Sequence, residues 1–262
     1  MAKNLNVNSV ERALAVLELL DSAHRALNVS EISRKLGVPK STAHVIVLTL
    51  ERLGYVVRDP LTHGCTLGLK VYSLGREMMR NMSLPDQALP HMRWLVDRTK
   101  LTAHLAVLEK NQAIYVQKVD GPSLIRFDTF IGKRTGLHST GVGKVLLAYA
   151  PKLFRNEFLR KTTFARYTAK TITSASALRK ALDKITVQGY AVDDQEEELE
   201  VRCVAAPVFN QAGEPAAALS LTGTIGQVNA DNIEGIVSLL KQAAERICRS
   251  LDMPAPSVEG GA

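Results

Sequence analysis

The residues best suited to bind a small molecule gather in the later part of this 262-residue chain. A glycine-rich stretch precedes an apolar run that predicts a helix: Gly136-Leu137-His138-Ser139-Thr140-Gly141-Val142-Gly143-Lys144. It is not a nucleotide-binding loop, because His138 stands where that motif needs its first glycine and Val145 follows the lysine where Ser or Thr is required. Two interpretations stay open. The N–H groups at this helix start bind an anion such as a carboxylate, or the glycines only permit close packing against a sheet.

Other polar side chains stand on predicted strands that could border the same site. Asp193 ends an apolar run, so its side chain can point into a pocket, where it suggests a ligand that is not purely anionic or a carboxylate that is bridged or protonated. Cys203 lies in another apolar run. It could contact a ligand, but a cysteine in such a run is more commonly a small buried residue of the core. Ser220 and Thr222 alternate with leucines, so their hydroxyls share one strand face. We expect the acidic run 196–198 to be a solvated loop.

These residues do not form a catalytic set that the sequence supports. His138 and Ser139 are neighbours and point apart in an extended chain, and no triad spacing is present. The chain has three widely spaced cysteines without a CxxC pair or zinc spacing, which is typical of a reducing cytoplasm. We therefore expect no enzyme activity, no metal and no other cofactor. The alternatives are a metabolic enzyme with an accessory helical domain and a redox sensor, which would need Cys203 as an accessible thiol of low pKa.

A second group of candidate residues lies near the N-terminus, where the order of elements predicts a winged helix-turn-helix. A helix over 31–36 stops at Gly37, and Pro39 suits the first turn of a second helix that ends at Gly54. Strands 55–58 and 65–67 around a turn predict a hairpin, the wing. Such a helix start enters the major groove of double-stranded DNA. The predicted DNA-contacting residues are Ser30, Lys40, Ser41, Thr42, His44, Arg58 and His63.

Composition limits the class of protein but does not identify it. A hydrophobic fraction of 46% allows a sizeable core, and the net charge is +7. Residues 1–80 carry 11 Lys and Arg against 7 Asp and Glu, a modest excess that a small helical domain without a DNA partner could also show. There is no apolar signal core and no run near the roughly eighteen apolar residues of a membrane span, so we expect a cytoplasmic protein.

The remaining pattern predicts an α+β protein of two domains. A first helix begins at an N-cap, Ser9, and carries Val10, Ala13, Leu14, Leu17 and Leu20 on one face. The expected parts are a winged helix-turn-helix over 1–67, a linker helix over 68–84 that ends near Pro85, a mainly antiparallel domain over 85–252 and a disordered tail over 253–262. Within the third part we expect helices over 88–99, 141–150, 152–159, 175–188 and 229–251, and strands over 104–108, 113–119, 125–129, 190–193, 203–209 and 216–222.

Taken together and in order, several motifs resemble the IclR family of bacterial transcriptional regulators. In the N-terminal part they are Ser9-Val10-Glu11-Arg12-Ala13-Leu14, the stretch from Ile32 to Thr42, and Leu53-Gly54-Tyr55-Val56. In the C-terminal part they are His138 to Lys144, Gly189-Tyr190-Ala191-Val192-Asp193-Asp194, Arg202 to Phe209, and Ala218-Leu219-Ser220-Leu221-Thr222-Gly223. The resemblance runs from about Ser9 to Leu251.

The resemblance implies a winged-helix domain joined by a helix to a GAF-like effector-binding domain. Such proteins bind operators as homodimers or homotetramers, and a small organic acid or aromatic carboxylate modulates the binding. More of them are repressors than activators, and a ligand-dependent activator of a catabolic operon is the alternative. Carried over by position, the effector site comprises the backbone at Gly141 and Val142, the polar side chains of Asp193, Cys203, Ser220 and Thr222, and wall residues Leu124 and Phe127.

Two positions depart from the family pattern. The family often has arginine where Val45 stands, so weight in DNA recognition moves to Lys40, Ser41, Thr42 and His44. The family tends to have glycine where Glu200 stands, beside the expected pocket. The second departure could change the shape of the loop and the choice of ligand.

Overall fold

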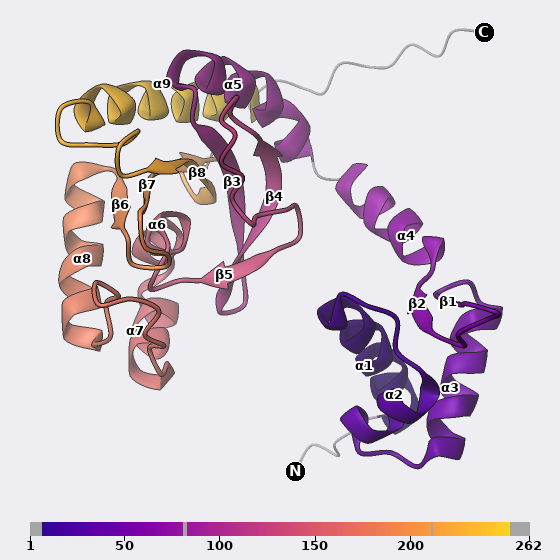
Figure 1. Ribbon diagram of the computed structural model, residues 1–262. Coiled ribbons are helices and arrows are strands. Elements are labelled where there is room, and N and C mark those ends of the chain that lie inside the picture. Colours follow the sequence, from indigo (N-terminus) through magenta and orange to yellow (C-terminus); the bar gives the residue numbers. More distant parts are fainter. Residues whose placement is uncertain (1–6, 81–82, 211, 252–262) are drawn as a thin grey trace, which may run out of the picture. The chain divides into compact units, whose positions relative to one another are not determined.

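The computed structural model describes residues 7–80, 83–210 and 212–251 (Figure 1). The chain divides into two compact units, residues 1–81 and 82–262. None of the helices within the described ranges is long and apolar enough to cross a membrane. The division lies close to the predicted junction between the linker helix and the second domain.

The N-terminal unit is a winged helix-turn-helix, as predicted. It comprises α1 (Asn8–Ala23), α2 (Val29–Leu36), α3 (Lys40–Arg52), the antiparallel hairpin β1 (Val56–Arg58) and β2 (Cys65–Leu67), and α4 (Leu69–Arg80). Its core is formed by apolar side chains from α1, the connection between α1 and α2, α2, α3 and the hairpin: Val16, Leu20, Leu27, Ile32, Ala43, Val47, Leu50, Val56 and Cys65.

Local hydrogen bonds define the helix-turn-helix. The side chain of Asn28 accepts the N–H of Glu31 at 2.9 Å, and the Glu31 carboxylate accepts the N–H of Asn28 at 2.9 Å, which is a capping box. At the other end of α2, Gly37 has the left-handed φ of 64° that a helix C-terminus favours. Pro39 then precedes the first residue of α3. These short-range signals explain why the sequence predicts the motif.

Several predicted details of this unit are wrong. α1 begins one residue before Ser9, and Val7 is its N-cap without a side-chain bond. The end of α3 agrees with the prediction, because Leu53 is its C-cap and Gly54 follows with a left-handed φ of 81°. Leu53 is 50% exposed, although its helical spacing from Leu50 predicts a place in the buried stripe of the second helix. On the apolar face of the first helix, Val10 and Leu14 are 54% and 55% exposed. Periodicity indicates an apolar stripe, but it does not show which part of the stripe the unit itself covers.

The C-terminal unit is an antiparallel sheet with helices on both faces, which confirms the α+β prediction. Its strands are β3 (Thr102–Glu109), β4 (Gln112–Val119), β5 (Arg134–Gly136), β6 (Ala191–Asp194), β7 (Val201–Phe209) and β8 (Pro215–Thr224). They are ordered β5-β4-β3-β8-β7-β6, with every neighbouring pair antiparallel. The helices are α5 (Ser83–Thr99), α6 (Gly141–Tyr149), α7 (Lys152–Lys161), α8 (Ala175–Gln188) and α9 (Ile233–Leu251).

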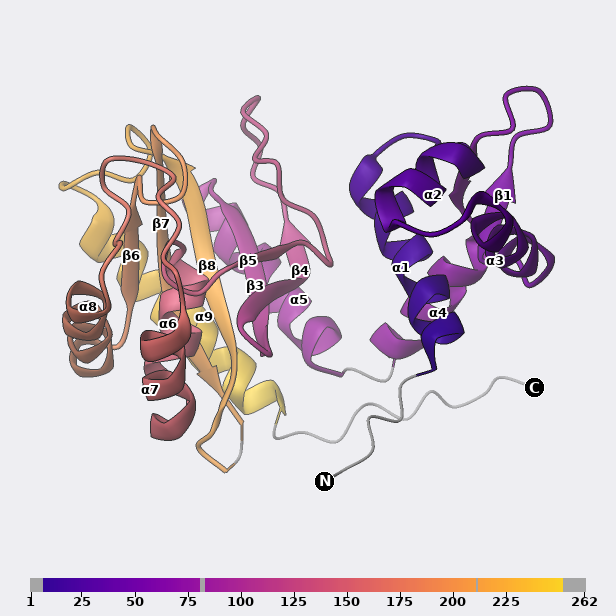
Figure 2. The same ribbon diagram turned by 90° about the horizontal axis from the view of Figure 1, so that it is seen from below.

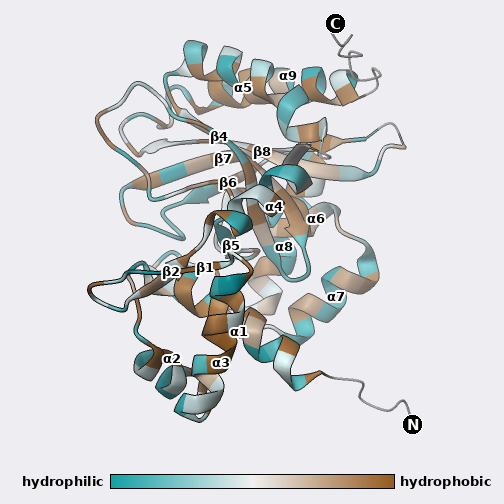
Figure 3. Ribbon diagram, turned by 90° about the vertical axis from the view of Figure 1, so that its right-hand side faces the viewer, coloured by the Kyte–Doolittle hydropathy of each residue, from teal (hydrophilic) through white to brown (hydrophobic). Residues whose placement is uncertain are grey.

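Alternation along the strands divides the core of this unit into two layers. Leu105 on β3 packs with α5 and α9 on one face, whereas its neighbour Ala106 packs with α6 and α8 on the other. Figures 1 and 2 show α5 and α9 side by side over the first face. Figure 3 shows hydrophobic residues of these two helices toward the sheet and hydrophilic residues on the opposite side.

The structure also corrects the predicted elements of this unit. Residues 125–129 are not a strand, because the edge of β4 pairs with β5, an element that the sequence did not reveal. α5 begins at Ser83, so Pro85 lies inside this helix and not at the end of the linker. α9 begins at Ile233, four residues after the predicted start. The predicted disordered tail, 253–262, lies outside the described residues.

Candidate functional site

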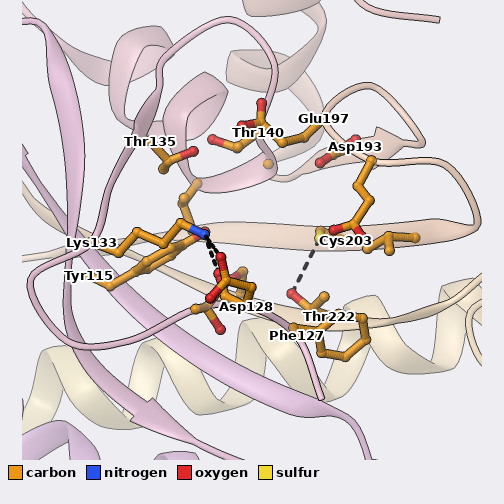
Figure 4. A pocket seen from close by; sticks show the side chains of 16 residues that line it. Tyr115, Phe127, Asp128, Lys133, Thr135, Thr140, Asp193, Glu197, Cys203 and Thr222 are labelled. Carbon is orange, nitrogen blue, oxygen red and sulfur yellow. Dashed lines mark hydrogen bonds and ion pairs between the residues drawn. The ribbon is translucent and has the colours of Figure 1, made fainter. Parts of the chain in front are cut away.

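A cavity of about 90 Å³ lies in the C-terminal unit at the start of α6 (Figure 4). It is bordered by β4, the segment between β4 and β5, β5 itself, the N-terminus of α6, β6 and the loop after it, β7 and β8. The lining residues are Tyr115, Phe127, Asp128, Thr129, Lys133, Thr135, Thr140, Gly141, Val142, Asp193, Glu197, Glu198, Val201, Cys203, Ser220 and Thr222.

The fold brings together all the predicted effector-site residues except one. Phe127, Gly141, Val142, Asp193, Cys203, Ser220 and Thr222 line the cavity. Leu124 does not, because its side chain is fully exposed. The placement of Leu124 in the wall was wrong: its segment is not a strand, so an alternating pattern does not turn its side chain inward.

The start of α6 combines close packing with exposure to the cavity. Thr140 caps the helix, since its Oγ1 accepts the N–H of Gly143 at 3.1 Å. A Cβ on Gly143 would lie 2.2 Å from the carbonyl oxygen of Gly136, so this position has no room for a side chain. The first-turn N–H groups of a helix have no acceptor within the helix and attract anions. The close-packing interpretation of the glycine-rich stretch is thus confirmed, and anion binding stays a prediction for the helix start that Gly141 and Val142 present to the cavity.

Lys144 does not act as a phosphate-binding lysine. Its side chain is buried, and Nζ donates to the carbonyl oxygen of Val192 at 2.8 Å and pairs with the carboxylate of Glu196. Burial raises the pKa of the Glu196 carboxyl, and the charge of Lys144 opposes this shift. The prediction of a solvated acidic run is thus wrong for Glu196, which is buried, and for Glu197, which lines the cavity. The ion pair ties α6 to the loop after β6.

Asp193 is the deeply buried carboxyl of the cavity. Its side chain is almost fully buried, and Oδ1 accepts the N–H of Glu196 at 2.8 Å. Burial raises the pKa of Asp193 to about 7, and the nearby charge of Lys144 opposes the shift. The group therefore exchanges a proton near neutral pH, which agrees with the expectation of a protonated or bridged carboxylate.

A hydrogen-bonded chain links the cavity to the segment between β4 and β5. Thr222 Oγ1 lies 3.2 Å from Cys203 Sγ and 3.4 Å from Nδ1 of His104, and the other ring nitrogen of His104 lies 2.8 Å from Thr129 Oγ1. Burial lowers the pKa of His104 to about 3, so the ring is neutral. Burial raises the pKa of the Cys203 thiol, which argues against a reactive thiolate.

The sequence did not indicate His104, although it stands opposite Ser220 in the strand register. Only the pairing of β3 with β8 brings it beside Thr222. His138, in contrast, lies outside the cavity lining and donates from Nε2 to the carbonyl oxygen of Ala165 at 2.9 Å. Among the described residues, no group of three His, Cys, Asp or Glu side chains could hold a metal ion.

In the N-terminal unit, most of the predicted DNA-contacting side chains are exposed. Ser30, Lys40, Ser41, His44 and His63 are exposed, and Thr42 is half-buried at the start of α3. Arg58 differs, because its guanidinium is largely covered and pairs with Glu51 at 3.3 Å. Val45 is 62% exposed on the same stretch of α3. A helix start and a hairpin therefore present polar groups to solvent, while Arg58 has a partner inside the unit.

Comparison with known proteins assigns both units. Residues 9–60 match the IclR helix-turn-helix domain, and residues 76–249 match the C-terminal domain of bacterial IclR transcriptional regulators. The chain belongs to the IclR family. The members found by these comparisons are DNA-binding transcriptional regulators and not enzymes, so this IclR-family protein is a transcriptional regulator with an effector-binding C-terminal domain.

Relatives resemble this IclR-family chain over nearly its whole length. It is 33% identical to the regulator XynR of Escherichia coli, covering 95% of this chain and 99% of XynR. It is 34% identical to KdgR of E. coli, covering 92% of each protein. Among solved structures, an IclR homologue from Microbacterium hydrocarbonoxydans in complex with 4-hydroxybenzoate superposes with a TM-score of 0.83 at 28% identity, covering 93% of this chain and 99% of that one. IclR of Thermotoga maritima has a TM-score of 0.76 at 31% identity, covering 95% of this chain and 100% of that one.

Proposed function

We propose that this protein is an operator-binding repressor whose affinity for DNA changes when a small carboxylic acid occupies the cavity at the start of α6. The observation that carries the proposal is a polar cavity beside a helix N-terminus in the same chain as a winged helix-turn-helix. Relatives named as repressors, among them IclR of E. coli, support the sign of regulation. Ligand-dependent activation of a catabolic operon is the alternative.

The cavity suits a compact organic acid. The start of α6 attracts a carboxylate, and Tyr115 and Phe127 give the lining an apolar part. Gly141, Val142, Asp193, Cys203, Ser220 and Thr222 are the proposed contacts. The aromatic acid bound to the Microbacterium homologue supports a carboxylate as the common feature of the ligand.

The DNA contacts are proposed for the start of α3 and the wing. The residues are Ser30, Lys40, Ser41, Thr42, His44 and His63, and Arg58 would have to leave its ion pair with Glu51 to join them. We propose that the protein acts in the cytoplasm, where its operator DNA would lie. We propose a homodimer or homotetramer, in which two-fold symmetry pairs two copies of α3 on half-sites of a near-palindromic operator.

Exposed apolar side chains on α1 and α4 support self-association. Leu14 on α1 is 55% exposed, and Tyr72 and Leu74 on α4 are 68% and 51% exposed. Leu14 and Leu74 line one apolar hollow together with Ala13, Leu17 and Val71. Exposed apolar side chains that gather around one hollow support a protein interface at this place.

The test is binding of the full-length protein to its own upstream intergenic DNA and to unrelated DNA of equal length, at fixed salt, with a panel of carboxylic acids. We expect preferential binding to the upstream DNA and a change on addition of one acid. Lys40→Ala should weaken DNA binding and reduce the slope of log affinity against log salt concentration by about one, the value for one phosphate contact. The matched control Lys152→Ala on α7 should change neither quantity. Equal affinity for both DNAs, or no response to any acid, contradicts the proposal.

Transcription in vitro separates the two signs of regulation. A repressor lowers transcript yield from the bound promoter, and the active acid restores it. An increase in transcript that depends on the acid would instead support the activator.

A further inference from the structure

One carboxylate oxygen in the cavity wall has no hydrogen-bond partner in the described part of the chain. Oε2 of Glu197 is shielded from solvent and forms no hydrogen bond with any residue that the structure describes. Glu197 lines the cavity, and Figure 4 shows it on the same side as Thr140 and Asp193. A buried acceptor is costly to leave without a donor. The bound molecule is therefore the expected source of that donor.

The neighbouring groups are already engaged with one another. Oδ1 of Asp193 accepts the backbone N–H of Glu196, and the Glu196 carboxylate pairs with buried Lys144. Thr140 donates its hydroxyl to the carbonyl oxygen of Gly136 at 2.8 Å. These contacts commit the Thr140 hydroxyl and the Lys144 ammonium to acceptors other than Glu197.

The cationic side chain of the cavity lining is also paired. Nζ of Lys133 lies 3.0 Å from a carboxylate oxygen of Asp128, on the segment between β4 and β5. Figure 4 shows this pair away from Asp193 and Glu197. One part of the cavity thus contains a carboxylate paired with a lysine, Asp128 with Lys133. Another part contains the carboxylate oxygen of Glu197, which accepts no hydrogen bond from the described residues.

We infer that Glu197 is a specificity-determining residue that accepts a hydrogen bond from a hydroxyl group of the effector, and that the effector is a hydroxy acid. The inference rests on the proposed function, which places the effector carboxylate at the start of α6. Thr140, Asp193 and Glu197 share one side of the cavity, so the hydroxyl belongs on a carbon close to the carboxylate (Figure 4). A 2-oxo acid would present a carbonyl oxygen to Glu197, and two acceptors would then face each other.

The test uses pairs of acids that differ in one oxygen function. Lactate and propionate differ by a hydroxyl close to the carboxylate, as do mandelate and phenylacetate, and pyruvate is the oxo counterpart of lactate. Titration calorimetry on the full-length protein measures binding of each acid. In at least one pair we expect the hydroxy acid to bind about tenfold or more tightly than its partner, because a site built to bond a hydroxyl rejects the analogue that lacks it. Pyruvate should bind more weakly than lactate.

Two variants assign the preference to Glu197. Glu197→Gln keeps the shape and adds an N–H donor, so the preference for lactate over pyruvate should fall by about tenfold. Glu197→Ala should abolish the preference for a hydroxyl. The control Glu157→Gln removes the same charge from an exposed ion pair with Lys161 on α7 and should keep the wild-type preference. Thermal unfolding of each variant shows that the fold is retained.

Equal binding within both pairs, no binding of any hydroxy acid, or an unchanged preference in both Glu197 variants overturns the inference. DNA binding measured in parallel separates this failure from that of the proposed function. Specific DNA binding that responds only to an acid without a hydroxyl leaves the proposed function intact. Absence of specific DNA binding contradicts the proposed function, whichever acid binds.

Discussion

Single carboxyl groups give the cavity a dependence on pH. The raised pKa of Asp193, about 7, means that the folded protein holds a proton that the unfolded chain releases near its ordinary value of 3.8. The stabilising contribution of this proton is complete below that ordinary value and is lost as the pH rises through about 7. Protonation also removes a negative charge from the wall that faces the proposed effector carboxylate.

Effector affinity should therefore be higher at pH 6 than at pH 8. The protonated fraction of a group with a pKa near 7 falls about tenfold over this interval, so a loss of affinity of up to about tenfold is expected. Calorimetry at both pH values measures it for an acid that stays ionised throughout. Asp193→Asn should remove the dependence, and a variant with the wild-type pH profile would contradict this role.

Val45 is the residue at which DNA binding could be strengthened. It is 62% exposed, four residues after the proposed contact Ser41 on α3. Val45→Arg would add a cation that can reach a phosphate, so we expect affinity for operator DNA to rise and the salt dependence to grow by about one contact. Fluorescence anisotropy at several salt concentrations measures both. Leu153→Arg, which adds the same charge on α7 of the other unit, should leave DNA affinity close to that of the wild type, and equal gains would contradict the assignment.

At the scale of elements, the site depends on how closely α6 packs against the segment that precedes it, at Gly136 and Leu137. The position of Gly143 against the backbone of Gly136 leaves no space for a methyl group. The ion pair of Lys144 with Glu196 then fixes the other side of the same helix. These two contacts, at the neighbouring residues Gly143 and Lys144, hold α6 in the position in which its first turn faces the cavity.

Gly143→Ala should destabilise the C-terminal unit strongly. The new Cβ would meet backbone atoms at 2.2 Å and 2.7 Å, and overpacking of this kind costs about 1–3 kcal/mol or more. Chemical denaturation measures the free energy of unfolding. Gly235→Ala on α9 is the matched control, since its Cβ would meet nothing within 4 Å and alanine is favoured over glycine in a helix by up to about 1 kcal/mol. Equal effects of both substitutions would show that close packing at Gly143 is unimportant.

Elements with local signals could be predicted, and contacts between distant segments could not. The helix over 175–188 was predicted at its observed bounds, because Ser174 caps its start and Gly189 adopts a left-handed conformation at its end. Residues 125–129 have the composition of a strand, yet a strand also needs an edge to pair with, and β5 occupies that edge.

The same limit applies to the site. Asp193, Cys203, Ser220 and Thr222 stand in motifs of the family, so the sequence indicated them. The places of His104, Lys133 and Glu197 depend on the register of β3 against β8 and on the course of two loops, which carry no short-range signature.

At the scale of the whole molecule, the proposed self-association would couple two copies of the DNA-binding helix. The exposed apolar side chains of α1 and α4 carry this proposal within the N-terminal unit. They are neighbours in one hollow, so a charge placed there would have to be buried on association.

Leu14→Lys should therefore weaken self-association and lower operator affinity by tenfold or more, which is about 1.4 kcal/mol. Analytical ultracentrifugation measures the assembly state, and thermal unfolding checks that each unit stays folded. Leu153→Lys on α7, where the leucine is 86% exposed, is the control. A Leu14→Lys protein that assembles like the wild type would place the interface elsewhere.

The strand order has a consequence for synthesis. β3 and β8 are neighbours at the centre of the sheet, although 105 residues separate the end of one at Glu109 from the start of the other at Pro215. The central pairing therefore waits until nearly the whole unit has left the ribosome, because non-local contacts form only when both partners exist. The winged helix-turn-helix has all its elements by Arg80 and can fold first. For part of each round of translation, the nascent chain therefore carries a complete DNA-binding unit whose sensor has not yet been made.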